Sequence, residues 1–92
     1  VVAVHRLRQG VAEALEAIAH GRRSTSKVVG RAVGKISLPK GASIGALVRG
    51  EEIILPDADT VIETDDHVIV FVPSRQQMPR VEKLFQVSAS FF

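Results

Sequence analysis

The sequence predicts a small α+β domain, in which a mixed or antiparallel sheet carries two helices in the order β-α-β-β-β-α, with an extra strand at the N-terminus. Two observations predict this class. Three short apolar segments between residues 43 and 73 are separated by charged turns, as expected of strands joined by hairpins. Segments with apolar residues at helical spacing flank them, over 26–36 and 79–85. The 92 residues suffice for one domain, 1–92, with 86–92 as a C-terminal tail.

The first twenty residues contain one clear strand and one ambiguous segment. Residues 1–7 alternate as a short strand does, and Gly10 ends it. In residues 11–20, Val11, Leu15 and Ile18 fall at helical spacing, and the intervening Ala and Glu residues are good helix formers. Intrinsic propensity alone therefore favours a helix there.

A helix is predicted over 26–36, with Ser26 as its N-cap. Its apolar stripe comprises Val29, Ala32, Val33 and Ile36, and its basic row comprises Lys27, Arg31 and Lys35. Gly30 and Gly34 lie inside it, each at a cost of up to about 1 kcal/mol relative to Ala. That cost suggests a close backbone approach to a sheet, a subunit or a ligand.

The three central segments are predicted strands. In the first strand, we expect one face to carry Ile44, Ala46 and Val48. The opposite face is expected to carry Gly45, Leu47 and Arg49. Gly50 permits a tight hairpin turn to the second strand, over 53–55, which Pro56 ends. A short strand is expected over 60–63, and the nearly unbroken apolar residues 68–72 predict a central strand covered on both faces.

The C-terminal segment predicts a second helix. Ser74 and Gln77 have the spacing of a capping box, but Pro79 favours a later start. Its expected buried stripe comprises Val81, Leu84 and Phe85. We expect Phe91 and Phe92 to dock on a partner or a neighbouring domain, because a free tail seldom exposes two phenylalanines.

Composition narrows the possible functions. The chain has no cysteine, and its apolar runs of about five or six residues are far shorter than the roughly 20 that span a bilayer. It begins within an apolar run, so we expect a fragment of a larger chain. Residues 1–50 carry nine Lys or Arg against two acids, whereas residues 51–92 carry three against eight. Such polarity suits a polyanionic partner, pairing between copies, or merely solvated faces.

No motif indicates an enzyme or a metal site. The three histidines are scattered, and the turn at Asp65 and Asp66 is predicted to be solvated, with a divalent ion as the less favoured alternative. The hydroxyls of 24–26 lack a neighbouring base. Nucleic acid is not expected as a partner, because the basic residues lack interleaved aromatic ones; those basic residues are Arg6, Arg8, Arg22, Arg23, Lys27, Arg31 and Lys35.

Five segments in order resemble the C-terminal regulator-of-potassium-conductance module, also called TrkA-C. They are Ser26-Lys27-Val28-Val29-Gly30-Arg31, Leu38-Pro39-Lys40-Gly41, residues 44–56, residues 59–63 with 66–71, and Val81-Glu82-Lys83-Leu84-Phe85. The flanking segments, with Ala12-Glu13-Ala14-Leu15-Glu16-Ala17 and Gln86-Val87-Ser88, are similar to the end of the bacterial TrkA family of potassium-uptake regulators. The resemblance implies that residues 12–20 are extended, against their helix propensity.

The resemblance also implies a non-catalytic role in potassium uptake. Modules of this family pair with one another in a ring on the cytoplasmic face of the cell membrane, beneath the Trk membrane subunit, and so couple ligand binding to potassium transport. No cofactor is expected in this fragment, whereas NAD or an adenine nucleotide is expected in upstream domains that it lacks. The partners expected are therefore a second copy and the membrane transporter.

Two sets of residues carry these expectations. In some relatives a cyclic dinucleotide binds between modules, and the matching positions are Val28, Val29, Ser43 and Ile44. The expected pairing surface comprises Val29, Gly30, Val33, Gly34, Phe91 and Phe92. Alternative functions are a small-ligand sensor at a dimer interface and, third, a nucleic-acid-binding fragment.

Overall fold

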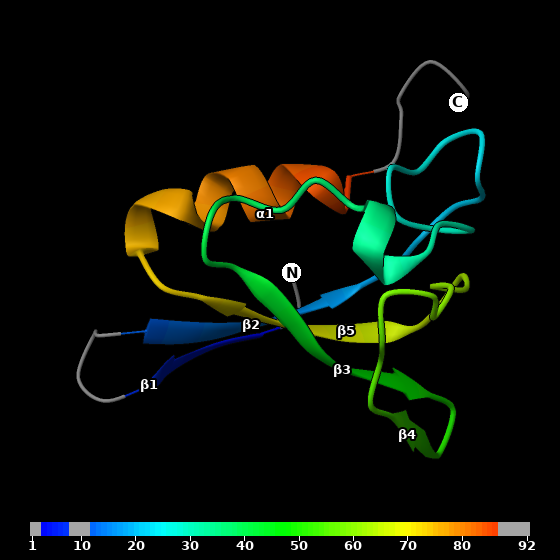
Figure 1. Ribbon diagram of the computed structural model, residues 1–92, viewed down its shortest axis with the longest axis horizontal. Coiled ribbons are helices and arrows are strands. Elements are labelled where there is room, and N and C mark those ends of the chain that lie inside the picture. Colours follow the sequence, from blue (N-terminus) through cyan, green and yellow to red (C-terminus); the bar gives the residue numbers. More distant parts are fainter. Residues whose placement is uncertain (1–2, 8–11, 87–92) are drawn as a thin grey trace.

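A computed structural model describes residues 3–7 and 12–86, which fold as one five-stranded sheet with a helix on one side (Figure 1). All neighbouring strands are antiparallel, in the order β1-β2-β5-β3-β4. The strands are β1 (Ala3–Leu7), β2 (Ala12–Ile18), β3 (Ser43–Arg49), β4 (Glu52–Ile54) and β5 (His67–Val72). The helical elements are the 3-10 helices η2 (Val33–Lys35) and η3 (Arg75–Gln77) and the α-helix α1 (Met78–Leu84). The predicted α+β class is confirmed.

Strand β2 confirms the extended structure that the family resemblance implies and contradicts the helix that propensity favours. It lies between β1 and β5, and Leu15 is paired with Val70 and Ala17 with Val68. Both Leu15 and Ala17 are fully buried. Pairing on two sides and burial of alternate residues outweigh a helix propensity of a few tenths of a kcal/mol per residue.

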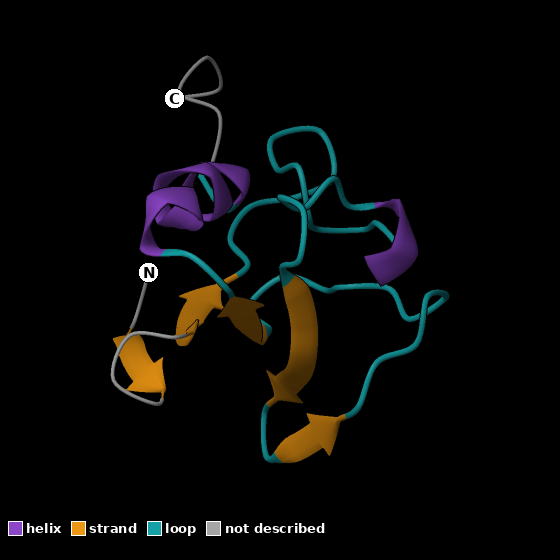
Figure 2. Ribbon diagram, turned by 60° about the vertical axis from the view of Figure 1, so that its left-hand side comes forward, coloured by secondary structure: helices purple, strands orange, loops and turns teal. Residues whose placement is uncertain are grey.

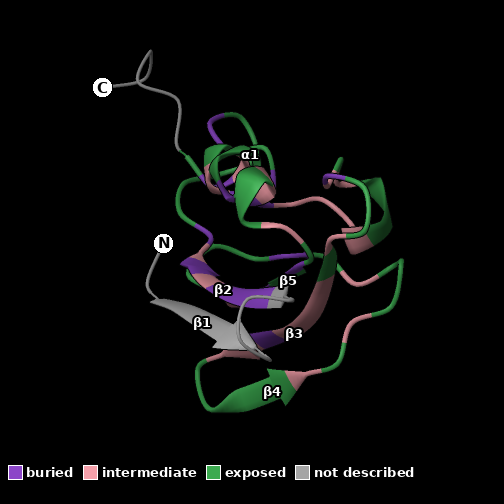
Figure 3. Ribbon diagram, turned by 90° about the vertical axis from the view of Figure 1, so that its left-hand side faces the viewer, coloured by how far each residue is buried: buried purple, intermediate pink, exposed green. Residues whose placement is uncertain are grey.

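The core lies between the sheet and α1. Three residues of β5, Val68, Val70 and Val72, have no exposed surface, and Met78, Val81 and Phe85 of the C-terminal segment are buried in the same cluster. The predicted stripe on this helix is confirmed, with Leu84 half-buried beside it. Figure 3 shows the contrast in burial between β2, which carries buried residues, and β4, which is mostly exposed.

The central position of β5 is confirmed, but its covering on both faces is not found among the described residues. The alternate residues of β5 are His67, Ile69 and Phe71, and the Phe71 side chain remains 42% exposed. The continuous apolar run therefore predicted the central strand correctly and overestimated how much of it this chain covers by itself.

A bulge in β3 changes the predicted faces of that strand. The register shifts between Ile44 and Ala46, so that Ile44 is opposite Val70 and Leu47 is opposite Val68. Ile44 and Leu47 therefore share the core side, whereas simple alternation separates them. Gly45 lies in the bulge against the Phe71 ring, where a Cβ has no room.

The helix predicted over 26–36 does not form. The Ser26 hydroxyl accepts hydrogen bonds from the amides of Val28 (3.1 Å) and Val29 (3.0 Å), as an N-cap does. Gly30 then takes a positive φ of 79°, which ends any right-handed turn. Residues 27–36 instead form turns and η2, visible as a separate short helix at the edge of the fold (Figure 2).

The backbone of residues 30–34 pairs with residues 58–62 rather than with itself. The amide of Gly30 donates to the Ile62 carbonyl (2.7 Å), and that of Val33 donates to the Thr60 carbonyl (2.8 Å). The strand expected over 60–63 is reduced to a single bridge between Ala32 and Val61. These contacts between two chain segments, which we call the loop layer, replace the hydrogen bonds of the predicted helix.

Replacing Gly34 by alanine is expected to lower the free energy of unfolding by roughly 1–3 kcal/mol, because its Cβ would overpack the loop layer. That Cβ would lie 2.9 Å from the Ala58 Cβ and 3.0 Å from the Ala58 carbonyl oxygen. Urea denaturation measures the change, and Lys35→Ala, at an exposed neighbouring position, is the matched control with an expected change within about 0.5 kcal/mol. Equal stability of Gly34→Ala and the control would contradict this packing.

The C-terminal helix begins late, as Pro79 predicts. Helix α1 starts at Met78, with Pro79 in its first turn. The Ser74 hydroxyl accepts from the Gln76 amide, but the Gln77 side chain donates to the Lys40 carbonyl (3.0 Å), so the capping box is not reciprocal. Phe91 and Phe92 lie outside the described residues. Among the described helices, none has the length and hydropathy needed to cross a bilayer.

Candidate functional site

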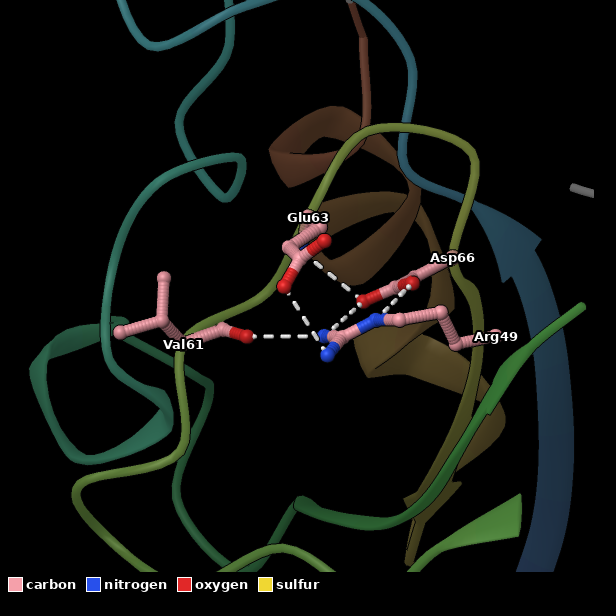
Figure 4. Close-up of polar contacts among 4 residues, drawn as sticks. All are labelled: Arg49, Val61, Glu63 and Asp66. Carbon is pink, nitrogen blue, oxygen red and sulfur yellow. Dashed lines mark hydrogen bonds and ion pairs between the residues drawn. The ribbon is translucent and has the colours of Figure 1, made fainter. Parts of the chain in front are cut away.

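One guanidinium group joins the sheet to the loop layer (Figure 4). Arg49, the last residue of β3, donates from Nε to Oδ1 of Asp66 (2.9 Å) and from Nη2 to Oδ2 (2.8 Å). Its Nη2 also donates to the Val61 carbonyl (3.0 Å), and its Nη1 lies 3.0 Å from Oε2 of Glu63. The bidentate geometry fixes the position of residues 61–66 relative to β3.

Asp66 is a buried carboxylate, with only 1% of its side chain exposed. Burial alone would raise the pKa of Asp66, but hydrogen bonds from Arg49 and from the Glu63 amide, together with the positive charge of Arg49, outweigh it and lower the pKa. The prediction of a solvated acidic turn therefore holds for Asp65, which is exposed, and is wrong for Asp66. A buried charge needs a partner, and Arg49 supplies it.

The sequence gives little signal for this pair. Arg49 and Asp66 are 17 residues apart, and each lies beside a segment whose sequence resembles a charged surface turn. Only the antiparallel pairing of β3 with β5 brings the two turns to the same end of the sheet. Sequence reasoning therefore missed the most highly connected polar group in the described part of the chain.

The four predicted ligand positions differ in accessibility. Val28 has no exposed surface and Val29 is 7% exposed, so a ligand could reach Val28 only if the core opened. Ile44 packs half-buried against the same core, whereas Ser43 is exposed at the start of β3. Their role in ligand binding remains a prediction.

The predicted pairing residues of the loop layer have contacts within the chain. Gly30 needs no partner to explain it, because its φ is positive and its carbonyl accepts from Arg23 Nη1 (3.1 Å). Gly34 is held against Ala58, and Val33 is half-buried against the core. The close backbone approach predicted for these glycines thus occurs within the chain, and pairing through them remains a prediction.

The side of the sheet opposite α1 is an apolar surface that no described element covers (Figure 1). The strand registers place on it the residues that we call the open face: Ala14, Glu16, Ile18, Ala46, Val48, Ile53, His67, Ile69 and Phe71. Ile53 is 70% exposed and Phe71 42%. The two polar members contact each other, with Glu16 Oε2 at 2.9 Å from His67 Nδ1. An apolar face across four strands is typical of an interaction surface.

The described residues offer no cluster of three His, Asp or Glu side chains that could hold a metal ion. The polar groups that converge around Arg49 form hydrogen bonds with one another. The arrangement can therefore hold segments together and present an apolar surface, and these capacities define the candidate site.

The chain is similar to several proteins named for potassium uptake. The chain is 55% identical over 92 residues to the Trk system potassium uptake protein TrkA of Halomonas elongata. The matched region covers 100% of this chain and 20% of that protein. It is 56% identical over 91 residues to the protein of the same name from Vibrio alginolyticus, with 99% and 20% covered. The Haemophilus influenzae protein is 46% identical over 88 residues, with 96% and 19% covered.

The chain thus spans about a fifth of the length of these relatives. Residues 23–86, well over half of the chain, match the TrkA-C domain family. This range includes the loop layer, the Arg49 network and α1. The chain therefore belongs to the TrkA-C domain family.

Proposed function

We propose that this chain is a non-catalytic regulatory and pairing module of a potassium-uptake system. Membership of the TrkA-C family and high identity to proteins named for Trk potassium uptake support this role. Within the longer protein, the module would transmit a ligand-driven change to a membrane transporter subunit on the inner face of the cell membrane. NAD or an adenine nucleotide would bind elsewhere in that protein.

The open face carries the pairing proposal. A second copy of the module is the occupant that fits best, because an apolar face can be self-complementary about a two-fold axis. Its polar pair, Glu16 with His67, is hydrogen-bonded within one copy and requires no polar group from the partner. Covering the face would also bury Phe71 and Ile53, whose exposure is otherwise unfavourable.

Replacing Phe71 by glutamate is expected to convert a dimer of the chain into a monomer, because each interface would gain two buried, unpaired carboxylates. Sedimentation velocity over a range of protein concentrations measures this change. Val61→Glu is the matched control, since Val61 is 45% exposed but lies in the loop layer rather than on the open face. Circular dichroism melts check that both variants fold.

Two results would overturn the surface proposed here. A wild-type chain that stays monomeric at high concentration would exclude pairing of the module by itself. A dimer that survives Phe71→Glu but dissociates with Val61→Glu would transfer the interface to the loop layer, where Gly30 and Gly34 were first predicted to pair.

A further inference from the structure

We propose a second site in this module, which binds a small phosphate-bearing anion between α1 and the loop that precedes β3. Two segments far apart in the sequence line a hollow of about 290 Å³ there, and its lining residues are Lys27, Ser37, Pro39, Arg80, Lys83 and Leu84. Half of these residues are cations, and none is a carboxylate. The proposal does not depend on pairing through the open face.

The three cations of the hollow are uncompensated in the described part of the chain. Lys27, Arg80 and Lys83 are all exposed, and none makes an ion pair or a side-chain hydrogen bond with another described residue. Two other described arginines do have carboxylate partners, Arg49 with Asp66 and Arg75 with Glu13. Three like charges around one hollow create a positive potential that an anion relieves.

The chemistry of the lining suits phosphate. Arg80 can donate two parallel hydrogen bonds to phosphate oxygens, and the two lysines act as mobile point charges beside it. The Ser37 hydroxyl adds a neutral donor, while Pro39 and Leu84 form an apolar wall. The volume lies at the lower limit of ligand pockets, which favours a phosphate group or a short polyphosphate over a large ligand.

The walls of the hollow are held in place before any ligand arrives. Pro39 is buried, and the neighbouring Lys40 carbonyl accepts a hydrogen bond from Gln77 at the start of the C-terminal helical segment. This contact ties the loop to the element that carries Arg80 and Lys83. A preorganised site loses less entropy on binding than one formed by free side chains.

A second basic hollow provides an internal comparison. It is lined by Arg23, Gly30, Arg31, Ala32 and Lys35, all from one continuous segment of the chain that ends in η2. Arg23 is already engaged there, because its Nη1 donates to the Gly30 carbonyl. The hollow beside α1 is therefore the better-built anion site, since its cations are unengaged and converge from two elements.

Titration of the chain with inorganic pyrophosphate, followed by amide chemical shifts in NMR spectra, tests the site. We expect saturable shifts at Lys27, Ser37 and Lys83, and a loss of affinity of about tenfold or more in the double variant Arg80→Gln, Lys83→Gln. Both residues are exposed on α1 and glutamine is a good helix former, so this variant should keep the fold. Lys35→Gln is the matched control, with affinity expected within about twofold.

Sedimentation with vesicles of phosphatidylglycerol, against vesicles of phosphatidylcholine, separates two sources of the phosphate. Binding of pyrophosphate that requires Arg80 and Lys83 supports a free phosphate compound, and binding of only the anionic vesicles with the same requirement supports a lipid headgroup. The proposal is overturned if neither probe binds, if the double variant binds as well as the wild type, or if Lys35→Gln has the larger effect.

Discussion

Replacing Asp66 by alanine is expected to lower the free energy of unfolding by about 3 kcal/mol at neutral pH, the lower end of the range for breaking a buried ion pair. The lower end applies because the Arg49 side chain is 31% exposed and can partly turn to water when its partner is lost. The variant also removes the acceptor of the Glu63 amide, which loosens the turn before β5. Urea denaturation with a fixed slope measures the change.

Glu63→Ala is the matched control for Asp66→Ala. It removes a second carboxylate from the same guanidinium, but that carboxylate is 61% exposed, so the expected loss is at most about 1 kcal/mol. Equal losses in the two variants would mean that burial of Asp66 does not determine the strength of the pair. A loss of less than 1 kcal/mol in Asp66→Ala would contradict the ion pair itself.

The pH dependence follows from the lowered pKa of Asp66. A carboxyl group whose pKa is lower in the folded than in the unfolded state stabilises the fold above its unfolded pKa, near 3.8, and loses this contribution as the pH falls through its folded pKa. The stability difference between wild type and Asp66→Ala should therefore be constant near neutral pH and shrink below about pH 3.8. A difference that grows with acidity would have the wrong sign.

Replacing Leu15 by alanine is expected to lower the free energy of unfolding by about 2–5 kcal/mol, as for other fully buried leucines. Leu15 has no exposed surface and lies opposite Val70 in the middle of the sheet. Its loss leaves a cavity between β2 and α1 that a paired central strand cannot collapse to fill. Denaturant unfolding of the chain, at a concentration where sedimentation velocity finds a monomer, gives the value.

Ile18→Ala tests the strand assignment against the helix that propensity favours. A helix would place Leu15 and Ile18 on one buried stripe, with similar costs, whereas the strand places them on opposite faces of the sheet. Ile18 is half-exposed on the open face, so its truncation should cost about 1 kcal/mol, well below Leu15→Ala. Similar costs in the monomer would contradict β2.

The sequence predicted those elements whose pattern is set by burial along one strand or helix. The alternation and apolar content of 43–49 and 67–72 identified strands, and the family resemblance corrected the Ala-rich β2. The sequence pattern gave the wrong prediction where two segments far apart in the chain form hydrogen bonds with each other. The apolar stripe of 26–36 matches a helix. In the structure, however, the positive φ of Gly30 turns the backbone, and carbonyl groups of residues 58–62 accept hydrogen bonds from the amides of residues 30–34.

For the candidate sites, too, local sequence was informative and contacts between distant segments were not predicted. The family positions Val28, Val29, Ser43 and Ile44 could be located by comparison of segments, yet nothing in them indicated that Val28 is inaccessible. The Arg49–Asp66 pair and the open face depend on the sheet order and on the bulge in β3, and the basic hollow depends on the packing of α1 beside the segment before β3. Such features become visible only when the strands are placed side by side.

The position of Arg49 links the two sides of the sheet. Arg49 and Val48 are consecutive residues of β3, so one holds the loop layer while the other lies on the open face. A displacement of the loop layer that pulled on the guanidinium would move the strand that carries Val48. One strand thus joins the ion pair that holds the loop layer to the face proposed for pairing, because Val48 and Arg49 share the same stretch of backbone.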